Sequence, residues 1–177
     1  MQGQPFFYEE VKELLYRLEQ KFEIKTIVNA RDFLRLKIDN LQVYFVNERV
    51  YRYGKSNIIN GIKVDNFFNI LANKLTAILS RDEEKDVFDI VNISLAYDFY
   101  WTDILDAAHK KEVFEDYSLL ERLKTFPLNW FEKLKLIKKL IITDDVIESL
   151  CEDIKHKNKN SLFKMDIPAH FESSEYP

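Results

Sequence analysis

Five of the charged residues between positions 74 and 89, three cations and two carboxylates, have types and spacings that could form ion pairs or place cations beside a bound anion. They are Lys74, Arg81, Lys85, Asp86 and Asp89. On a helix beginning near Asn66, Lys74 lies one turn from both Ile70 and Ile78, so it interrupts the apolar face. Arg81 follows seven residues later and shares the face of Lys74. Because an unpaired charge beside apolar surface is costly, these two cations need an anionic partner.

The anionic partner has two candidates, a protein carboxylate or a bound phosphate. The next helix, from about Glu84, turns an apolar stripe inward and places Lys85, Asp86 and Asp89 on the opposite, polar side. A Lys85–Asp89 pair on that side would contribute only about 0.3 kcal/mol. The residues alone favour a structural ion pair for Lys74 and Arg81 and a solvated face for the second helix.

Hydrophobic periodicity divides the chain into a strand-containing part and a helical part. The expected strands are 23–29, 33–39, 41–46 and 61–64. The expected helices are 5–22, 66–81, 84–97, 102–112, 115–124, 129–140 and 144–155. Asp39-Asn40 is expected to form a tight turn between two strands, and Asp65 or Asn66 to cap the helix that follows. The tyrosine- and asparagine-rich stretch 48–60 is expected to be a loop.

These elements predict a single α+β domain over residues 1–177. Residues 1–64 form its α/β part, which contains a hairpin, and residues 65–155 form its helical part. A polar, basic hinge at 155–160 leads into a mobile tail over 156–177.

The run Lys74-Leu-Thr-Ala-Ile-Leu-Ser-Arg81-x-x-x-Lys85-Asp86-x-x-Asp89 resembles the signature of the AbiEii/AbiGii nucleotidyltransferase toxin family. In that family a lysine helix ends in arginine and is followed by a Lys-Asp-x-x-Asp element. Three further segments are similar to family motifs and occur in the same order: Leu41-Gln42-Val43-Tyr44-Phe45, Gly61-Ile62-Lys63-Val64 and Pro127-Leu128-Asn129-Trp130. The similarity covers residues 4–140.

This resemblance implies a partial nucleotidyltransferase-like mixed sheet followed by a mostly helical C-terminal half. It implies that Lys74, Arg81 and Lys85 contact nucleotide phosphates, and that Asp86 and Asp89 are the catalytic carboxylates that position them. The reaction implied is Mg²⁺-dependent transfer of a nucleotidyl group from a nucleoside triphosphate to an RNA or protein acceptor. The setting implied is a bacterial toxin–antitoxin system, with a separately encoded antitoxin as protein partner.

The family's first motif has no counterpart in this sequence. It is a glycine-rich turn followed by an Asp-x-Asp pair, whose carboxylates would hold Mg²⁺. Asp144-Asp145 is adjacent rather than alternate and is expected at a helix N-terminus, while Asp39 and Glu48 are further carboxylate candidates. We therefore expect metal-dependent transfer to be near background, as in a truncated, degenerate or repurposed family member. Loss of the motif's strand exposes a sheet edge, which predicts homodimerisation or aggregation.

Composition excludes several other classes of site. The three glycines, Gly3, Gly54 and Gly61, are too far apart for a phosphate-binding glycine loop. One cysteine, Cys151, and three widely separated histidines argue against a disulfide framework and a histidine/cysteine metal site. A net charge of −4 argues against a strongly basic nucleic-acid binder. Without a targeting segment or an apolar run of ~20 residues, the chain is expected to be cytoplasmic and not to enter a membrane.

The alternative function is a non-enzymatic protein-interaction module. The chain contains 14 phenylalanines and 9 tyrosines, and aromatic residues are enriched at protein interfaces. The run Tyr97-Asp98-Phe99-Tyr100-Trp101 could be core or an exposed binding surface, and ordinary burial favours the core for this run and for Trp130. A large exposed apolar patch would favour the binding module, whereas a cleft lined by Lys74, Arg81 and Lys85 would favour a nucleotide site.

Overall fold

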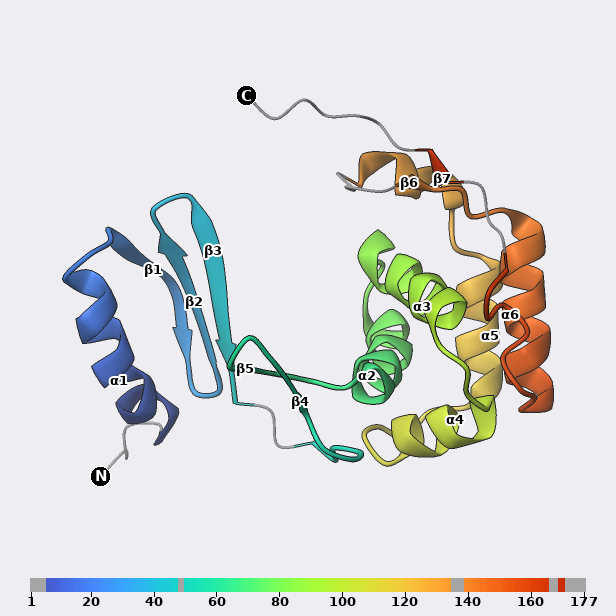
Figure 1. The fold of residues 1–177 in the computed structure, drawn as a ribbon, viewed down its shortest axis with the longest axis horizontal. Helices are drawn as coiled ribbons and strands as arrows, with labels where there is room; N and C mark the ends of the chain where they lie inside the picture. Colours follow the sequence, from blue (N-terminus) through green and yellow to red (C-terminus); the bar gives the residue numbers. More distant parts are fainter. Residues whose placement is uncertain (1–5, 48–49, 135–138, 166–168, 171–177) are drawn as a thin grey trace. The chain divides into compact units, whose positions relative to one another are not determined.

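The computed structural model describes residues 6–47, 50–134, 139–165 and 169–170. The chain, expected as one domain, is divided by its internal contacts into two compact units, Met1–Val50 and Tyr51–Pro177. The first unit contains one helix and a three-stranded sheet, and the second is mostly helical (Figure 1). The expected α+β class is confirmed.

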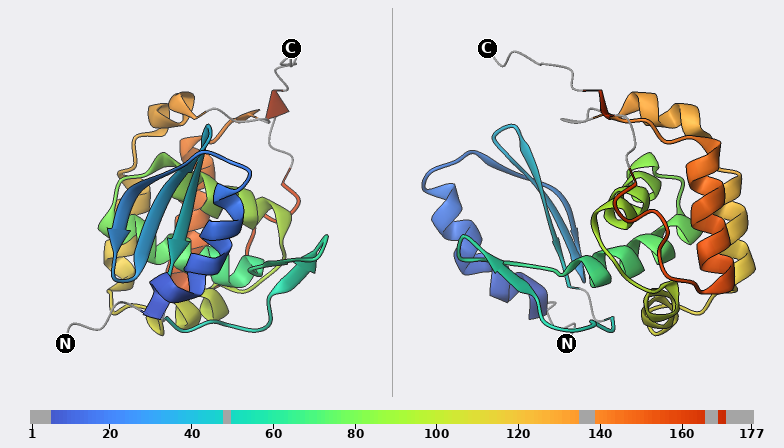
Figure 2. Two further views of the ribbon diagram at one scale, coloured as in Figure 1. Left: turned by 90° about the vertical axis from the view of Figure 1, so that its left-hand side faces the viewer. Right: turned by 45° about the vertical axis from the view of Figure 1, so that its right-hand side comes forward.

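In the N-terminal unit, a helix lies across one face of an antiparallel sheet. The elements are α1 (Phe6–Glu19), β1 (Ile24–Ala30), β2 (Phe33–Ile38) and β3 (Leu41–Val46). The strand order is β1–β2–β3, and Figure 2 shows α1 crossing the three strands. The resemblance implied a mixed sheet, but both strand pairs described here are antiparallel. Short connections between successive strands allow only antiparallel pairing, which explains the difference.

The hairpin between β2 and β3 forms as expected from its turn residues. Asp39 has a positive φ of 49°, and its carboxylate accepts a hydrogen bond of 3.1 Å from the backbone N of Glu23. Along β2 the side chains alternate, so that Leu34 and Leu36 are buried against Val11 of α1. This alternation leaves the sheet with one face covered by α1 and one face that α1 does not cover.

The C-terminal unit begins with a short hairpin. β4 (Asn57–Ile59) lies in the stretch expected to be a loop and pairs with β5 (Ile62–Val64). The turn residues Asn60 and Gly61 have φ values of 51° and 78°. Positive φ at both positions is typical of two-residue hairpin turns, and Asn-Gly is their preferred sequence. The hairpin exposes three isoleucines, Ile58, Ile59 and Ile62.

Five helices form the body of the C-terminal unit and match the expected positions closely. They are α2 (Phe67–Ser80), α3 (Glu84–Ala96), α4 (Trp101–His109), α5 (Asp116–Lys124) and α6 (Asp144–His156). Asn66 caps α2 as expected, since its side chain accepts a hydrogen bond of 2.9 Å from the backbone N of Asn69. The apolar faces of the helices form one core around Trp101. No helix among the described residues is both long and apolar enough to cross a lipid bilayer.

The expected helix over 129–140 is wrong. The chain forms a 3-10 helix, η1 (Leu128–Lys133), and then leaves the helical conformation at Leu134. Residues 135–138 lie outside the described residues. The ring of Phe131 lies 6.5 Å from that of Phe88 on α3, so tertiary packing overrides the helical periodicity here.

Residues 157–165, expected to be a hinge and the start of a mobile tail, pack against α3 and α4. Asn160 is buried, and its side chain donates hydrogen bonds to the backbone oxygens of Ser94, at 2.6 Å, and Tyr97, at 2.9 Å. The backbone oxygen of Asn158 accepts a bond of 2.9 Å from the backbone N of Trp101. This segment is therefore fixed by polar contacts, which hydrophobic periodicity does not detect.

The two shortest strands join the end of the described chain to the segment before α6. β7 (Ala169–His170) pairs antiparallel with β6 (Lys139–Leu140). The rest of the expected tail, residues 166–168 and 171–177, lies outside the described residues.

Candidate phosphate-binding site

Two successive helices place the candidate site residues. After α2 ends at Ser80, Arg81 adopts an extended conformation (φ −151°, ψ 155°), and α3 begins three residues later. Leu75 and Ile78 of α2 share one buried cluster with Val91 of α3. Because the helices pack together through these stripes, the first turns of α3 lie against the last turns of α2. The candidate residues from both helices are thereby brought together.

Asp86 lies at the centre of the site, with only 1% of its side chain exposed. Its Oδ1 accepts a hydrogen bond of 2.8 Å from Lys74 Nζ, and its Oδ2 accepts one of 2.7 Å from Arg81 Nε. Arg81 Nη2 adds a bond of 3.1 Å to Oδ1. Bidentate pairing of a guanidinium with a carboxylate is strong and fixes the geometry of both groups. Asp86 is therefore a buried counter-ion for two cations.

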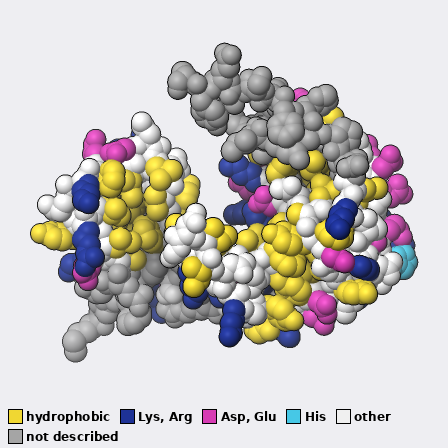
Figure 3. Space-filling model, viewed as in Figure 1, with side chains coloured by type: hydrophobic (Ala, Val, Ile, Leu, Met, Phe, Trp, Pro, Cys, Tyr) yellow, Lys and Arg dark blue, Asp and Glu magenta, His cyan; other side chains and the backbone are white. Residues whose placement is uncertain are grey.

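Asp89 and Lys85 lie at the margin of this cluster. Lys74 Nζ is 2.6 Å from Asp89 Oδ2, and 40% of the Asp89 side chain is exposed. Lys85 is exposed and forms no ion pair with the described residues, so the Lys85–Asp89 pair considered from the sequence is not present. The structure thus joins Lys74, Arg81, Asp86 and Asp89, hereafter the ion-pair cluster, and leaves Lys85 on the surface of α3. Figure 3 shows basic and acidic side chains side by side on the C-terminal unit.

The expectation that Asp86 lies on a solvated face is wrong. Helical periodicity describes the stripe of α3 alone, and it correctly turns Val87 and Phe88 inward. The side of α3 that bears Asp86 is covered by Lys74 of α2 and by Arg81, the residue that follows α2, and the sequence of α3 does not reveal this. The ion pair favoured for Lys74 and Arg81 from the residues alone is present.

A second ion pair, which sequence analysis did not identify, lies at the same end of α2. Arg122 of α5 places its Nη2 2.7 Å from Asp82 Oδ1. Its Nε donates a hydrogen bond of 2.9 Å to the backbone oxygen of Ile78. This bond satisfies one of the carbonyl groups that the last turn of a helix leaves unpaired. No local pattern could predict it, because Arg122 and Ile78 are 44 residues apart in the sequence.

The charges of the ion-pair cluster stabilise one another. Burial alone would raise the pKa of Asp86, but the hydrogen bonds and positive charges of Arg81 and Lys74 outweigh it and hold that pKa below its ordinary value. Burial would likewise lower the pKa of Lys74, yet the contacts with Asp86 and Asp89 raise it. Both side chains are therefore charged at neutral pH.

We expect the ion-pair cluster to lose its stabilising effect in acid. Because the pKa of Asp86 is lower in the folded chain than in the unfolded chain, its contribution is present above about pH 4 and is lost as the pH falls through the folded value. Urea unfolding of the wild type and of Asp86→Asn should therefore give a difference in unfolding free energy that shrinks below about pH 4. A difference that stays constant down to about pH 2 would contradict this reading.

The carboxylates of the cluster do not fit the Mg²⁺ that the resemblance implies. Mg²⁺ needs free carboxylate oxygens, but both oxygens of Asp86 accept hydrogen bonds from cations, and Asp89 Oδ2 contacts Lys74. The adjacent ammonium and guanidinium groups would also repel a divalent cation. Arg81, by contrast, has a side chain that is 56% exposed. The carboxylates of the cluster therefore position its two cations rather than a metal ion.

The aromatic residues singled out by the sequence divide between core and surface. Phe99 and Trp101 are buried in the core of the C-terminal unit, whereas Tyr97 and Tyr100 are exposed. Trp130 is only partly buried. The run at 97–101 thus alternates between the two environments and does not form a continuous aromatic surface.

The remaining carboxylate candidates have local contacts. Asp144 and Asp145 are the first residues of α6, where negative charge interacts favourably with the helix dipole. Asp39 holds the hairpin turn described above, and Glu48 lies outside the described residues. Within the described part of the chain, no group of three or more His, Cys, Asp or Glu side chains is arranged to hold a metal ion.

Cysteine and histidine side chains are engaged elsewhere in the C-terminal unit. Burial raises the pKa of the Cys151 thiol to about 11, so the thiol stays protonated. His109 Nε2 lies 2.7 Å from Asp116 Oδ1, between α4 and α5. His156 contacts Glu152 within α6. Neither histidine contact involves a residue of the ion-pair cluster.

Comparisons with protein families, with curated proteins and with solved structures give no match to this chain. The resemblance to the AbiEii/AbiGii toxins therefore depends on the motif at residues 74–89 and on the order of the neighbouring segments.

Proposed function

We propose that this chain binds a nucleoside triphosphate through its phosphate groups, at Arg81, Lys74 and Lys85. Asp86 and Asp89 act as positioning residues that hold the cations. The proposal combines the resemblance of residues 74–89 to nucleotidyltransferase toxins with the contacts among these side chains.

The conformation of Arg81 carries the proposal. Its guanidinium is fixed by two hydrogen bonds to buried Asp86, yet more than half of its side chain is exposed. A cation held in place before its ligand arrives loses little freedom on binding, and this favours affinity for phosphate. Lys85, one residue before Asp86, adds a second exposed positive charge at the start of α3.

The resemblance extends the proposal to the class of reaction. Members of the family transfer a nucleotidyl group from the triphosphate to an RNA or protein acceptor and are opposed by an antitoxin. In this chain, transfer would require Mg²⁺ bound by carboxylates other than Asp86 and Asp89, whose oxygens are engaged by Lys74 and Arg81. Binding of the triphosphate is therefore the step that the described residues support.

Nucleotide binding should depend on Lys85, although this side chain contributes little to folding. We expect calorimetric titration with ATP, GTP, CTP and UTP, with and without Mg²⁺, to show binding of at least one triphosphate. Lys85→Gln should weaken that binding about tenfold, equivalent to 1.4 kcal/mol, with an unchanged Tm. Arg81→Gln should abolish binding and lower the Tm as well, because it also removes two hydrogen bonds to Asp86.

The control is Lys159→Gln, which removes another surface lysine; unlike Lys85, Lys159 is paired with an aspartate, Asp98, at 2.9 Å. This variant should bind the nucleotide as the wild type does. No binding of any triphosphate to the folded wild type would reject the proposal and leave a protein-interaction module as the better account. Equal loss of affinity in Lys85→Gln and Lys159→Gln would show that the binding is non-specific.

A further inference from the structure

Among the described strands, β3 forms one edge of the three-stranded sheet and pairs only with β2. Its six residues, Leu41-Gln42-Val43-Tyr44-Phe45-Val46, include no charged side chain and no proline, and they pair with β2 without a shift in register. β1, at the other edge, carries Lys25 and has an irregularity between Thr26 and Val28. Charges and bulges are the usual features that prevent an edge strand from pairing with another chain. β1 has both, whereas β3 has neither.

The hairpin fixes which backbone groups of β3 point away from the sheet. With a two-residue turn, Ile38 and Leu41 form the first hydrogen-bonded pair. Leu41 and every second residue after it therefore direct N–H and C=O toward β2. The N–H and C=O groups of Gln42, Tyr44 and Val46 point to the open side, where they can pair with a further strand.

We propose that β3 pairs with β3 of a second copy of this chain, antiparallel and centred on Tyr44. This two-fold register uses all three outward-pointing residues. Tyr44 faces Tyr44 of the second copy, and Gln42 faces Val46. The two sheets then form one sheet of six strands, with both α1 helices on the same face. This inference does not depend on nucleotide binding.

Charge and apolar exposure favour a second copy as the occupant of this edge. A strand without charges can lie opposite itself without bringing like charges together, which would be destabilising. Leu41, Tyr44 and Val46 are 66%, 52% and 58% exposed, respectively, and Figure 3 shows hydrophobic side chains gathered on the N-terminal unit. Aromatic and β-branched residues stabilise a sheet when they meet across strands. In the proposed register Tyr44 meets Tyr44 of the second copy and Val43 meets Phe45, which are pairs of this kind.

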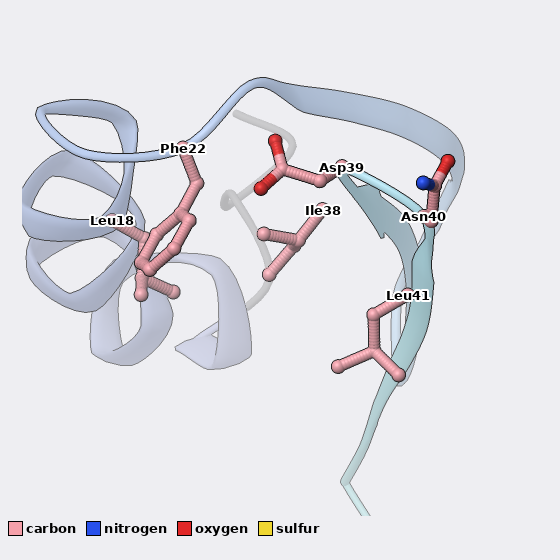
Figure 4. A pocket seen from close by; sticks show the side chains of 6 residues that line it. All are labelled: Leu18, Phe22, Ile38, Asp39, Asn40 and Leu41. Carbon is pink, nitrogen blue, oxygen red and sulfur yellow. The ribbon is translucent and has the colours of Figure 1, made fainter. Parts of the chain in front are cut away.

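A pocket adjoins the start of β3 (Figure 4). Its apolar walls come from the end of α1 and from the hairpin, and its lining residues are Leu18, Phe22, Ile38, Asp39, Asn40 and Leu41. In the proposed register Leu41 faces Asn47 of the second copy. The second copy would therefore leave the sheet beside the pocket, to which Leu41 of β3 contributes.

The test compares charge variants at the two-fold centre. Analytical ultracentrifugation of the wild type should give the mass of a dimer at micromolar concentration. Tyr44→Lys and Tyr44→Glu should each give a monomer, because the register places like charges opposite each other. An equimolar mixture of the two variants should restore a dimer, since lysine then faces glutamate. Ile27→Lys, at the irregular part of β1, is the matched control and should remain dimeric.

Hydrogen exchange of the wild type provides a second test that needs no substitution. The amides of Gln42, Tyr44 and Val46 should be protected, and their protection should rise with protein concentration. A monomeric wild type with rapidly exchanging amides at these positions would overturn the proposal. So would dimers of Tyr44→Lys alone, or a mixture of the charge variants that stays monomeric.

Discussion

Replacing Asp86 with alanine is expected to lower the free energy of unfolding by about 3 kcal/mol. The side chain is almost fully buried and accepts three hydrogen bonds from Lys74 and Arg81. Removing one member of a buried pair costs about 3–5 kcal/mol, because the remaining charge is left without compensation. The lower end of this range applies here, since Arg81 can turn toward water and Lys74 keeps its contact with Asp89. Urea unfolding at neutral pH measures the change.

Asp89→Ala is the matched control for this prediction. It removes a carboxylate from the same helix, one turn further on, and that carboxylate also contacts Lys74. Because the Asp89 side chain is 40% exposed, its ion pair should contribute less than about 1 kcal/mol. Equal losses of stability in Asp86→Ala and Asp89→Ala would show that burial of Asp86 does not determine the energetics of the cluster.

The site was predictable as a set of residues but not as a geometry. The apolar neighbours of Lys74 on α2 indicated that this cation needs an anionic partner, and the partner is a carboxylate of the next helix. The spacing of residues within α3 could not show that α2 covers the side of α3 that bears Asp86. That depends on the turn at Arg81, whose extended conformation sets how α3 returns along α2. The contact of Arg122 with Ile78 was out of reach for the same reason, since it joins distant segments.

The fold was predictable where a local pattern decides the structure. The alternation of Leu34 and Leu36 marked β2, and the cap at Asn66 marked the start of α2. The prediction was wrong at 129–140, where apolar spacing suggests a helix but Phe131 packs against α3. Residues 157–165 were misjudged because their polar composition resembles a solvated tail. Composition does not reveal that a polar side chain has partners across the fold.

Replacing Asn160 with alanine is expected to lower the free energy of unfolding by about 3 kcal/mol. Its side chain donates to the backbone oxygens of Ser94 and Tyr97, and its Oδ1 accepts a hydrogen bond of 3.2 Å from the backbone N of Leu162. Alanine would leave these groups unpaired in a buried environment, and each unpaired group costs about 1–3 kcal/mol. Chemical denaturation of the variant measures the loss.

Asn158→Ala is the control for Asn160→Ala, because it removes the same type of side chain from an exposed position in the same segment. The Asn158 side chain is exposed, and only its backbone groups contact α4 and α6, so the change should stay within about 0.5 kcal/mol. If the segment detaches without global unfolding, Asn160→Ala should keep its unfolding midpoint but become sensitive to trypsin at Lys157 and Lys159. A variant with unchanged stability and unchanged proteolysis would show that Asn160 does not anchor residues 157–165.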